Sequence, residues 1–298
     1  MTSSGPSTRQ DRREALRVDR RQRQRKQQAA QRRRRLLTAL AAVVVVAVIA
    51  VISIILITGQ DDSSGGDLAP MVAVADPYPG LPQQTKLLGD PNAPLKLVEY
   101  GDYQCVACHG AQQTVVPTLI QRYVATGTVS FEFRDFLVID RGLASQRGSD
   151  YDYESLRAAE GAMCAGDQGQ YWAFHESLYR NWTGEGVGDF SESRVRDLAA
   201  KLGLDTAAFN GCLDNKTYQS AVQQQDGDAS AAGVSGTPTF MIGDQKISGS
   251  TVDDDIAQID AILVANGITP PAAVATPPPA NPAAAVAPPV AILPDRKH

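Results

Sequence analysis

A pair of cysteines separated by two residues lies between a strand-like run and a helix-like run. Residues 95–100 are mostly apolar and read as a strand buried on both faces. The turn that follows ends at Cys105 and Cys108, and apolar residues then recur at helical spacing up to about residue 124. Two cysteines three residues apart at a helix start share one face of the helix, within the Cα separation that a disulfide needs.

The start of a helix favours a thiolate at Cys105. The first backbone N–H groups of a helix have no partner within it, and the positive end of the helix dipole lies there. Such a position can lower a cysteine pKa from about 8.5 to roughly 3.5–7.5, and the thiolate is the nucleophile of disulfide exchange. We therefore expect Cys105 to attack or be attacked, and Cys108 to resolve the mixed disulfide.

Two structural uses of the pair are less favoured. The remaining cysteines, Cys164 and Cys212, do not form a second C-x-x-C pair, and the chain has only three histidines, so we expect no zinc or other metal site. A structural bridge between Cys105 and Cys108 would close so short a loop that it would stabilise the fold little.

A c-type haem is the alternative of a different class. Cys105, Cys108 and His109 match the C-x-x-C-H pattern that attaches such a haem, and a membrane-anchored cytochrome would fit the flanking sequence. The second axial ligand would have to be a methionine or histidine elsewhere in the chain. The candidates are Met163, His175 and Met241.

The composition of the N-terminal part of the chain predicts a membrane-spanning segment. Residues 1–35 hold thirteen Lys/Arg and three acids, while the remainder of the chain is acidic. Residues 36–57 carry no charge, and as a helix of about 33 Å they would cross the hydrocarbon core of a bilayer. The basic arm predicts a cytoplasmic N-terminus and an extracytoplasmic domain, where disulfides persist. We thus predict a single-pass protein of the cell membrane.

Two other interpretations of this region are weaker. A cleaved signal peptide has an apolar region of about 7–15 residues with a small-residue site close behind. Here the apolar run is longer, and the nearest Ala-x-Ala that follows it is at residues 73–75. The basic arm has no aromatic residues among its arginines and abuts the apolar run, so we expect it to contact anionic lipid headgroups and not nucleic acid.

The rest of the chain divides by composition. Residues 58–84 are rich in Gly, Ser and Pro and read as a linker, and residues 268–298 are a Pro/Ala-rich tail expected to be extended or disordered. Between them the pattern predicts a strand, a helix that Pro117 should kink, a second strand, a helical block over about 150–232, a hairpin and a last helix from Thr251. This order suggests an α/β thioredoxin-like fold with an inserted helical subdomain.

Two motifs carry a family resemblance. Residues 89–108, from Gly-Asp-Pro-Asn-Ala-Pro to Cys108, and residues 233–240, Gly-Val-Ser-Gly-Thr-Pro-Thr-Phe, resemble the DsbA-like branch of the thioredoxin superfamily. The similarity runs over about residues 85–267. It implies that Cys105 and Cys108 are the redox-active pair and that no cofactor is needed.

The resemblance also assigns other roles. It implies that Thr237 and a cis Pro238 face the redox pair and hold a substrate backbone. It matches Glu99 to a buried acid that exchanges protons with the inner cysteine; an ordinary carboxylate at a strand end is the alternative. It implies a structural disulfide between Cys164 and Cys212, worth roughly 3–4 kcal/mol, with two buried free thiols as the alternative.

One departure from the family pattern concerns redox strength. Many relatives have proline and then a polar or aromatic residue between the cysteines, whereas this chain has Val106 and Ala107. Ala107 has no side chain to stabilise the thiolate, which leaves His109 as a candidate substitute. The expected function is a membrane-tethered extracytoplasmic thiol–disulfide oxidoreductase that donates disulfides to thiol-containing secreted polypeptides and is reoxidised by a membrane redox partner. An isomerase or a reductase of the same fold is the alternative.

Overall fold

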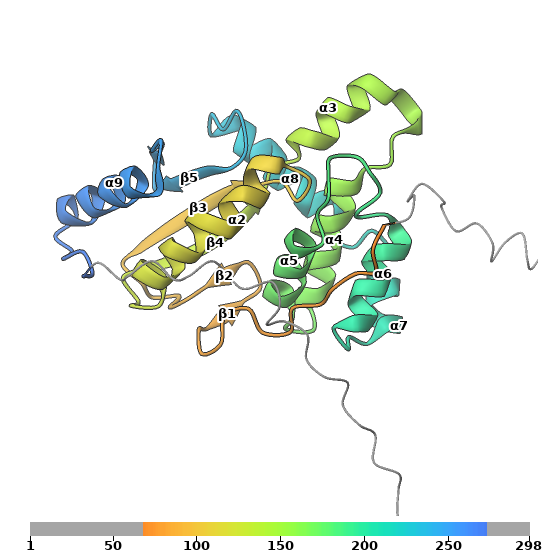
Figure 1. Cartoon of the computed structure of the whole chain (residues 1–298), viewed down its shortest axis with the longest axis horizontal. Helices are drawn as coiled ribbons and strands as arrows, with labels where there is room; N and C mark the ends of the chain where they lie inside the picture. Colours follow the sequence, from red (N-terminus) through yellow and green to blue (C-terminus); the bar gives the residue numbers. More distant parts are fainter. Residues whose placement is uncertain (1–67, 273–298) are drawn as a thin grey trace, which may run out of the picture. The chain divides into compact units, whose positions relative to one another are not determined.

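A six-stranded mixed sheet forms the centre of the structure, a computed structural model that describes residues 68–272 (Figure 1). The central pair of strands, β3 and β4, is parallel, and the other neighbours are antiparallel. The strands lie side by side in the order β1-β2-β4-β3-β5-β6. Their bounds are β1 Gln83–Gln84, β2 Leu87–Leu88, β3 Leu95–Gly101, β4 Val129–Asp135, β5 Thr239–Ile242 and β6 Gln245–Ile247.

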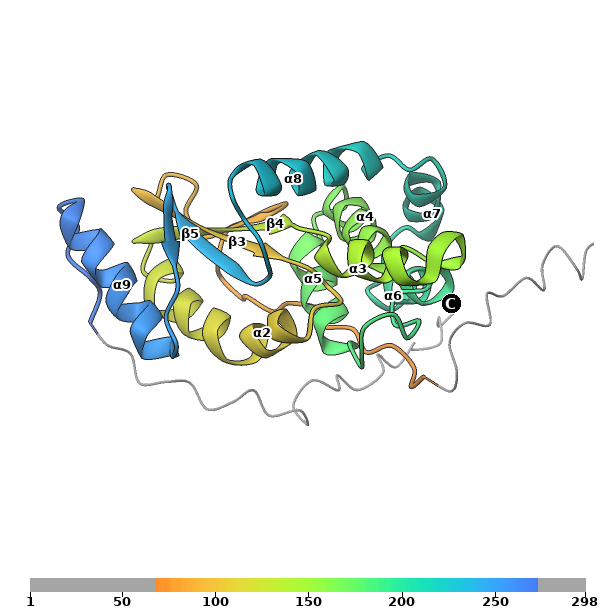
Figure 2. The same ribbon diagram turned by 90° about the horizontal axis from the view of Figure 1, so that it is seen from above.

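Helices cover both faces of the sheet and extend beyond one end of it. In Figure 2, α2 and α9 lie on one face, α8 lies on the other, and α3 to α7 gather at the end of the sheet. A π-helical turn, Ile120–Val124, and a short 3₁₀ turn, Gly148–Asp150, complete the helical elements. The α-helices are α2 Val106–Leu119, α3 Val138–Arg147, α4 Glu154–Gly166, α5 Tyr171–Arg180, α6 Glu192–Lys201, α7 Thr206–Asp214, α8 Gln219–Ala231 and α9 Val252–Ala265.

The alternation of β3 distributes its side chains between two cores. Leu97 belongs to the main core with α2, α5 and α9, while Tyr100 belongs to a smaller cluster with Ala229 of α8 and Val234. Successive residues of a strand point to opposite faces, so Glu99 shares the face of Leu97. A fully buried carboxyl group therefore lies among apolar side chains directly beneath α2.

Several predicted helix signals appear in the structure. Pro117 lies inside α2, and regular helix gives way to the π-helical turn at Ile120, consistent with a ring that disturbs the backbone ladder. Asp205 caps α7 by accepting hydrogen bonds from Ala207 and Ala208. The capping pair of Thr251 and Asp254 is confirmed, because Thr251 Oγ1 accepts from the Asp254 N–H at 3.1 Å.

The structure differs from the sequence prediction at two places. The helical region begins at Val138 of α3, whereas a start near residue 150 was predicted. Residues 71–84, which composition placed within a linker, lie against the domain. We call residues 71–78 the N-terminal strap: Met71 is buried, and β1 pairs with β2 just beyond it. The proline and glycine residues of this segment favoured a linker in the prediction. Its contacts with the domain are mostly backbone hydrogen bonds, which composition does not reveal.

The membrane prediction lies outside the part of the chain that the structure describes. Between residues 68 and 272 there is no helix both long and apolar enough to cross a bilayer. The predicted span, residues 36–57, and most of the predicted Pro/Ala-rich tail lie outside this range.

Candidate active site

The cysteine pair occupies the first turn of α2, at the end of the central strand β3. Cys105 is the N-cap residue with extended backbone angles, and its N–H donates to the Asp102 carbonyl at 3.1 Å. Cys105 and Cys108 are free thiols and both are buried. Val106, between them, is 59% exposed, so the turn presents an apolar side chain to solvent directly beside the outer sulfur.

The pKa values of the two thiols are shifted in opposite directions. The pKa of Cys105 is lowered to about 6, first by a hydrogen bond from Cys108 and then by the side chain of Thr237 and the backbone N–H groups of Cys108 and Ala107; burial opposes the shift. Burial raises the pKa of Cys108 well above its usual value, and the hydrogen bond to Cys105 and the charge of Glu99 add to this. The outer sulfur is thus held as a thiolate and the inner one as a thiol.

Thr237 and Pro238 face this pair from the loop that precedes β5. The peptide bond between them is cis. The Sγ atom of Cys105 lies 3.4 Å from the Thr237 carbonyl oxygen. The fold therefore brings together two segments more than 130 residues apart, as their motifs in the sequence implied.

Glu99 lies beneath the inner cysteine, and its pKa is raised to about 8 in all. Burial is the largest cause, the charges of Glu176 and Cys105 act in the same direction, and the hydrogen bond from Gln112 opposes them. Gln112 Nε2 donates to the two carboxyl oxygens of Glu99 at 3.1 and 3.4 Å. Gln112 is four residues beyond Cys108 on the same helix face, a spacing that would have marked it in the sequence.

A buried polar network holds the residue before the nucleophile. The side-chain Nε2 of Gln104, which has two N–H groups to donate, lies 2.7–2.9 Å from oxygen atoms of Asp140, Tyr151 and Ser155, and its Oε1 accepts from the Gly186 N–H at 2.7 Å. Its backbone carbonyl accepts from the Trp182 indole at 2.7 Å. These contacts join α3, α4 and the loop after α5 to the turn, and no local sequence pattern predicts them.

Asp102 anchors the same network. Its carboxylate accepts from Ser155 Oγ at 2.6 Å and from the N–H groups of Gln104 and Ile139 at 2.9 Å. The pKa of Asp102 is raised to about 7, because the effect of burial outweighs that of these hydrogen bonds.

An acidic side chain lies outside the turn. Glu185, in the exposed loop between α5 and α6, accepts a hydrogen bond from the Val106 N–H at 3.3 Å. That N–H is one of the free donors at the start of α2, so Glu185 shares with the Cys105 thiolate the positive end of one helix.

His109 does not contact the thiolate through a hydrogen bond. Its ring stacks on Trp182 with centroids 4.6 Å apart, and Nδ1 lies 3.1 Å from the Tyr179 carbonyl oxygen. A carbonyl only accepts, so Nδ1 carries the proton, and Nε2 is left to accept from Gln113. His109 thus packs the inner side of α2 against α5.

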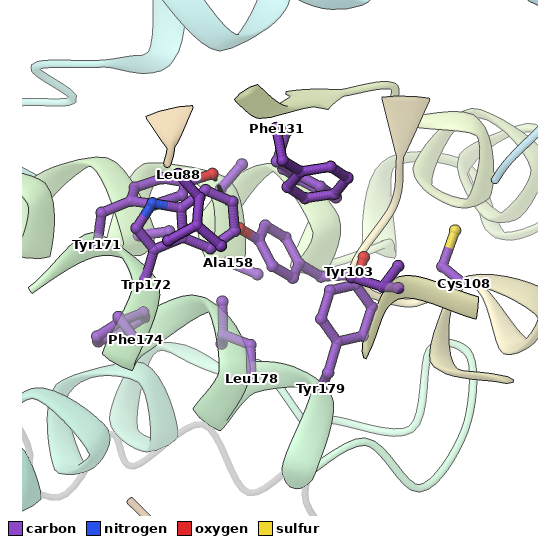
Figure 3. Close-up of a cluster of buried hydrophobic side chains, with 14 of the residues drawn as sticks. Leu88, Tyr103, Cys108, Phe131, Ala158, Tyr171, Trp172, Phe174, Leu178 and Tyr179 are labelled. Atoms are coloured by element: carbon purple, nitrogen blue, oxygen red, sulfur yellow. Dashed lines mark hydrogen bonds between the residues drawn. The ribbon is translucent and has the colours of Figure 1, made fainter. Parts of the chain in front are cut away.

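A layer of aromatic side chains, formed by Tyr103, Tyr171, Trp172 and Tyr179, lies between the redox turn and the rest of the helical insertion. Figure 3 shows Tyr103 and Tyr179 beside Cys108, with Tyr171 and Trp172 farther along α5. His175 lies within this layer: its Nδ1 is 2.9 Å from the Tyr103 hydroxyl, and burial lowers its pKa to about 3, so it is neutral.

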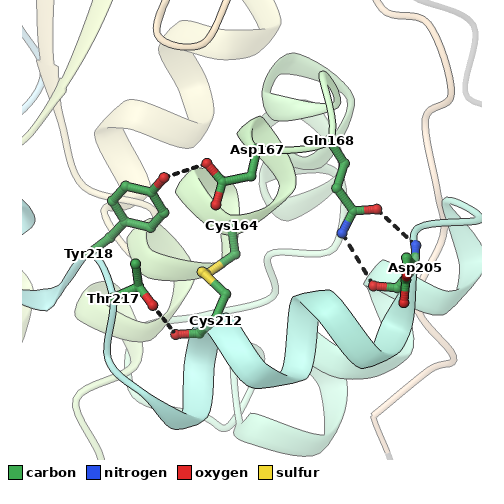
Figure 4. The surroundings of a disulfide bond; sticks show 7 residues. All are labelled: Cys164, Asp167, Gln168, Asp205, Cys212, Thr217 and Tyr218. Carbon is green, nitrogen blue, oxygen red and sulfur yellow. Dashed lines mark hydrogen bonds between the residues drawn. A yellow bond between two sulfur atoms is a disulfide. The ribbon is translucent and has the colours of Figure 1, made fainter.

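The second cysteine pair is a disulfide within the helical insertion. Cys164 of α4 and Cys212 of α7 are bonded, with Cα atoms 5.9 Å apart (Figure 4). Hydrogen bonds surround it: Tyr218 donates to Asp167, and Thr217 Oγ1 donates to the Cys212 carbonyl at 3.0 Å. The bridge joins two helices far from each other in sequence.

The residues considered for a metal or haem are dispersed. Within residues 68–272 no group of three or more His, Cys, Asp or Glu side chains is placed to hold a metal ion. Met241 packs with the smaller core cluster on the α8 side of the sheet, whereas Met163 packs against the main core and His175 lies within the aromatic layer. The three candidate axial ligands therefore do not converge on Cys105 and Cys108.

The thioredoxin family model matches residues 82–261. The chain belongs to the thioredoxin family. A probable disulfide bond formation protein D of Bacillus cereus is 31% identical over 52% of this chain and 68% of the relative. Disulfide bond formation protein D of Bacillus subtilis is 25% identical over 58% of this chain and 73% of the relative.

A solved structure confirms the thioredoxin-like fold. The crystal structure of oxidised BdbD from Bacillus subtilis superposes with a TM-score of 0.52 at 22% identity, over 66% of this chain and all of that chain. Together with the disulfide-forming relatives, this makes the present chain a DsbA-like protein thiol–disulfide oxidoreductase. Family membership thus favours thiol chemistry over the cytochrome alternative.

Proposed function

We propose that this enzyme is tethered to the cell membrane by residues 36–57 and donates a disulfide between Cys105 and Cys108 to thiol-containing polypeptides outside the cytoplasm. One observation carries the direction of transfer: hydrogen bonds lower the pKa of Cys105 to about 6. A stabilised thiolate belongs only to the reduced enzyme, so it favours reduction of the enzyme and oxidation of the substrate.

The exchange balances in two steps. A substrate thiolate attacks Cys105 Sγ of the oxidised pair, the Cys105–Cys108 bond breaks, and a mixed disulfide forms. Cys108 leaves as a thiolate and takes the proton of Glu99. A second substrate thiolate then attacks the substrate sulfur of the mixed disulfide, so that the substrate disulfide forms and Cys105 leaves as a thiolate. Two electrons pass from the substrate to the enzyme.

Thr237 and Pro238 support the substrate in this proposal. Proline has no N–H, and the Thr237 carbonyl oxygen lies 3.4 Å from Cys105 Sγ. An extended substrate can therefore align its backbone beside the sulfur that it meets. The exposed Val106 offers an apolar contact next to the same sulfur.

The reduced enzyme needs an electron acceptor to work again. We assign this step to a membrane protein linked to quinone, since the predicted anchor keeps the enzyme at the bilayer. The disulfide between Cys164 and Cys212 has a structural role in this scheme, because Cys164 is buried and the pair lies in the helical insertion.

The direction of electron flow is tested by the reduction potential of the Cys105–Cys108 pair. A value near that of strong oxidants, about −120 mV, supports donation, whereas a value near −270 mV would indicate a reductase. An oxidase oxidises a model peptide dithiol, whereas an isomerase rearranges a substrate with scrambled disulfides. Measurement of both activities separates the two. A Soret band in the purified protein would instead support the cytochrome alternative.

A further inference from the structure

A short loop of the helical insertion lies beside the redox turn and carries an acidic side chain to it. The loop comprises residues 183–189, between α5 and α6. Glu185 in this loop is exposed, and its Oε1 accepts a hydrogen bond from the Val106 N–H at 3.3 Å. Val106 directly follows Cys105, so the carboxyl group of Glu185 bonds to the residue next to the sulfur that meets the substrate.

The 183–189 loop is tied down at its two ends. Asp189 accepts hydrogen bonds from Thr183 Oγ1 at 2.9 Å and from the Gly184 N–H at 3.2 Å. The carboxyl group of Glu154, in α4, accepts from the N–H groups of the residues on either side of Asp189, at 3.0 and 2.9 Å. The loop is therefore closed on itself and attached to α4.

The middle of the loop is joined to the redox turn. The Gly186 N–H donates to Gln104 Oε1 at 2.7 Å, and Arg147 of α3 donates to the Gly186 carbonyl at 2.9 Å. Gly186 has a φ of +65°, a backbone conformation that glycine adopts without a steric penalty. Hydrogen bonds to the next residue thus fix the position of Glu185 relative to the cysteine pair.

The charge of Glu185 has no basic partner in the part of the chain that the structure describes. None of the salt bridges within residues 68–272 includes Glu185. Arg147 gives its hydrogen bond to a backbone carbonyl, and its guanidinium lies over the ring of Tyr151, 5.8 Å from the centroid. A cation from outside the domain can therefore pair with Glu185.

Exposed apolar side chains accompany this carboxyl group. Val106 is 59% exposed, and Val187, two residues after Glu185, is 42% exposed. A carboxylate together with exposed valines suits a long side chain that is apolar along its stem and positively charged at its end. Lys and Arg are the two side chains with this composition.

We propose that Glu185 selects substrates by binding a Lys or Arg side chain next to the substrate cysteine and by repelling Asp or Glu at the same place. This inference rests on the proposed function, in which a substrate cysteine forms a mixed disulfide with Cys105. The Thr237 carbonyl oxygen lies 3.4 Å from Cys105 Sγ, and Glu185 bonds to Val106 beside it. A substrate attached to this sulfur therefore has the residues that flank its own cysteine close to Glu185.

The test is a competition between peptides for Cys105 in the full chain. The Cys108→Ala variant traps mixed disulfides on Cys105, because the thiol that would resolve them is absent. Three peptides with one cysteine each, flanked on both sides by Arg, Gln or Glu, compete in a buffer of reduced and oxidised glutathione. One thiol replaces another on Cys105 Sγ without net oxidation, and intact mass spectrometry gives the ratio of bound Arg peptide to bound Glu peptide.

We expect Glu185→Gln, made in the Cys108→Ala variant, to lower this Arg-to-Glu ratio by roughly 2–5-fold, the effect of one exposed ion pair. Gln keeps an oxygen that accepts from the Val106 N–H and loses only the charge, whereas Glu185→Lys reverses the charge and should lower the ratio further. The reactivity of each peptide thiol is the same in every variant, and any change in Cys105 itself affects all peptides alike, so both cancel. Glu192→Gln, at the exposed start of α6, is the matched control and should leave the ratio unchanged.

The outcomes separate this inference from the proposed function. The same Arg-to-Glu ratio with and without the Glu185 charge would overturn the inference, and so would the absence of any mixed disulfide on Cys105. If Glu185→Lys fails to fold, Glu185→Gln still decides the question. Oxidation of a Gln-flanked peptide dithiol by the protein with both cysteines is measured in parallel. Its absence refutes disulfide donation without altering the competition.

Discussion

Two pairs of cysteines lie in one domain, and the structure treats them in opposite ways. Cys105 and Cys108 are three residues apart at a helix start, are both reduced, and have very different acidities. Cys164 and Cys212 are 48 residues apart, are bonded to each other, and join two helices. Free N–H groups and Thr237 face the first pair, whereas packed helices enclose the second. The comparison shows that the groups around a cysteine pair, more than the sulfur atoms themselves, determine whether the pair is reactive or structural.

Removal of the outer sulfur should have the largest effect. We expect Cys105→Ser to abolish peptide-dithiol oxidation, because no other group can form the mixed disulfide, while the fold is retained since a hydroxyl replaces a thiol of similar size. Turnover of a fluorescent peptide dithiol measures this, with thermal unfolding as the check on folding. Activity retained in Cys105→Ser would show that the first pair is not the redox centre.

Removal of the second pair should affect stability and leave the chemistry intact. We expect the double variant Cys164→Ala, Cys212→Ala to lose roughly 3–4 kcal/mol of unfolding free energy, because a bridge over 48 residues restricts the unfolded chain. Denaturant unfolding gives this value, and the rate of peptide oxidation per folded molecule should stay near that of the wild type. A variant that kept its stability but lost its redox activity would reverse the roles of the two pairs.

The buried acid beneath the first pair should make stability depend on pH. The pKa of Glu99 rises from its ordinary value of 4.5 to about 8 in the folded state. The folded protein therefore holds a proton that the unfolded chain releases, so this contribution is complete below pH 4.5 and is lost as pH rises toward 8. We expect Glu99→Gln to flatten that fall in the unfolding free energy, as measured by denaturant unfolding at several pH values.

Part of the pH dependence will remain in Glu99→Gln, because burial also raises the pKa of Asp102 and of Glu176 to about 7. Removal of the Cys164–Cys212 bridge offers the contrast, since it should lower stability equally at every pH. A Glu99→Gln variant whose stability falls with pH as steeply as that of the wild type would contradict the buried protonated acid.

The smallest expected effect concerns Glu185, whose charge lies at the start of α2. Replacement by Gln removes a negative charge near the Cys105 thiolate, so we expect Glu185→Gln to lower the Cys105 pKa by about 0.2–0.7 pH unit. The rate of alkylation of Cys105 as a function of pH reports the shift. Glu192→Gln, which removes an exposed charge at the start of α6, serves as the control. A higher Cys105 pKa in Glu185→Gln would refute the competition for the helix start.

The site was predictable from sequence where its signals are local. Cys105 and Cys108 form a short motif, and Thr237 and Pro238 belong to a second recognisable stretch. The partners of Gln104 were not predicted, because their hydrogen bonds join residues 36–82 positions apart, and their types are common on any surface. Such contacts exist only once the chain has folded.

The fold followed a similar division. Strands β3 and β4, the hairpin and the last helix follow from alternation and capping, both of which are encoded within a few residues. The start of α3 was missed because Asp140 is its only buried residue, so the helix has little apolar periodicity. The N-terminal strap was predicted to be part of a linker. Its hydrogen bonds to Asn181 and Ser177 are made by its backbone, and amino-acid composition carries no information about backbone hydrogen bonds.

The immobilised Gln104 has a consequence for the energy of the redox cycle. Polar partners of its side chain and carbonyl hold the residue just before the nucleophile, and all of them come from the helical insertion. A turn held in this way cannot recoil when the sulfur–sulfur bond opens or closes. We therefore expect the two oxidation states to share one backbone at this turn, which would confine the reorganisation energy of each cycle to two sulfur atoms and the protons that follow them.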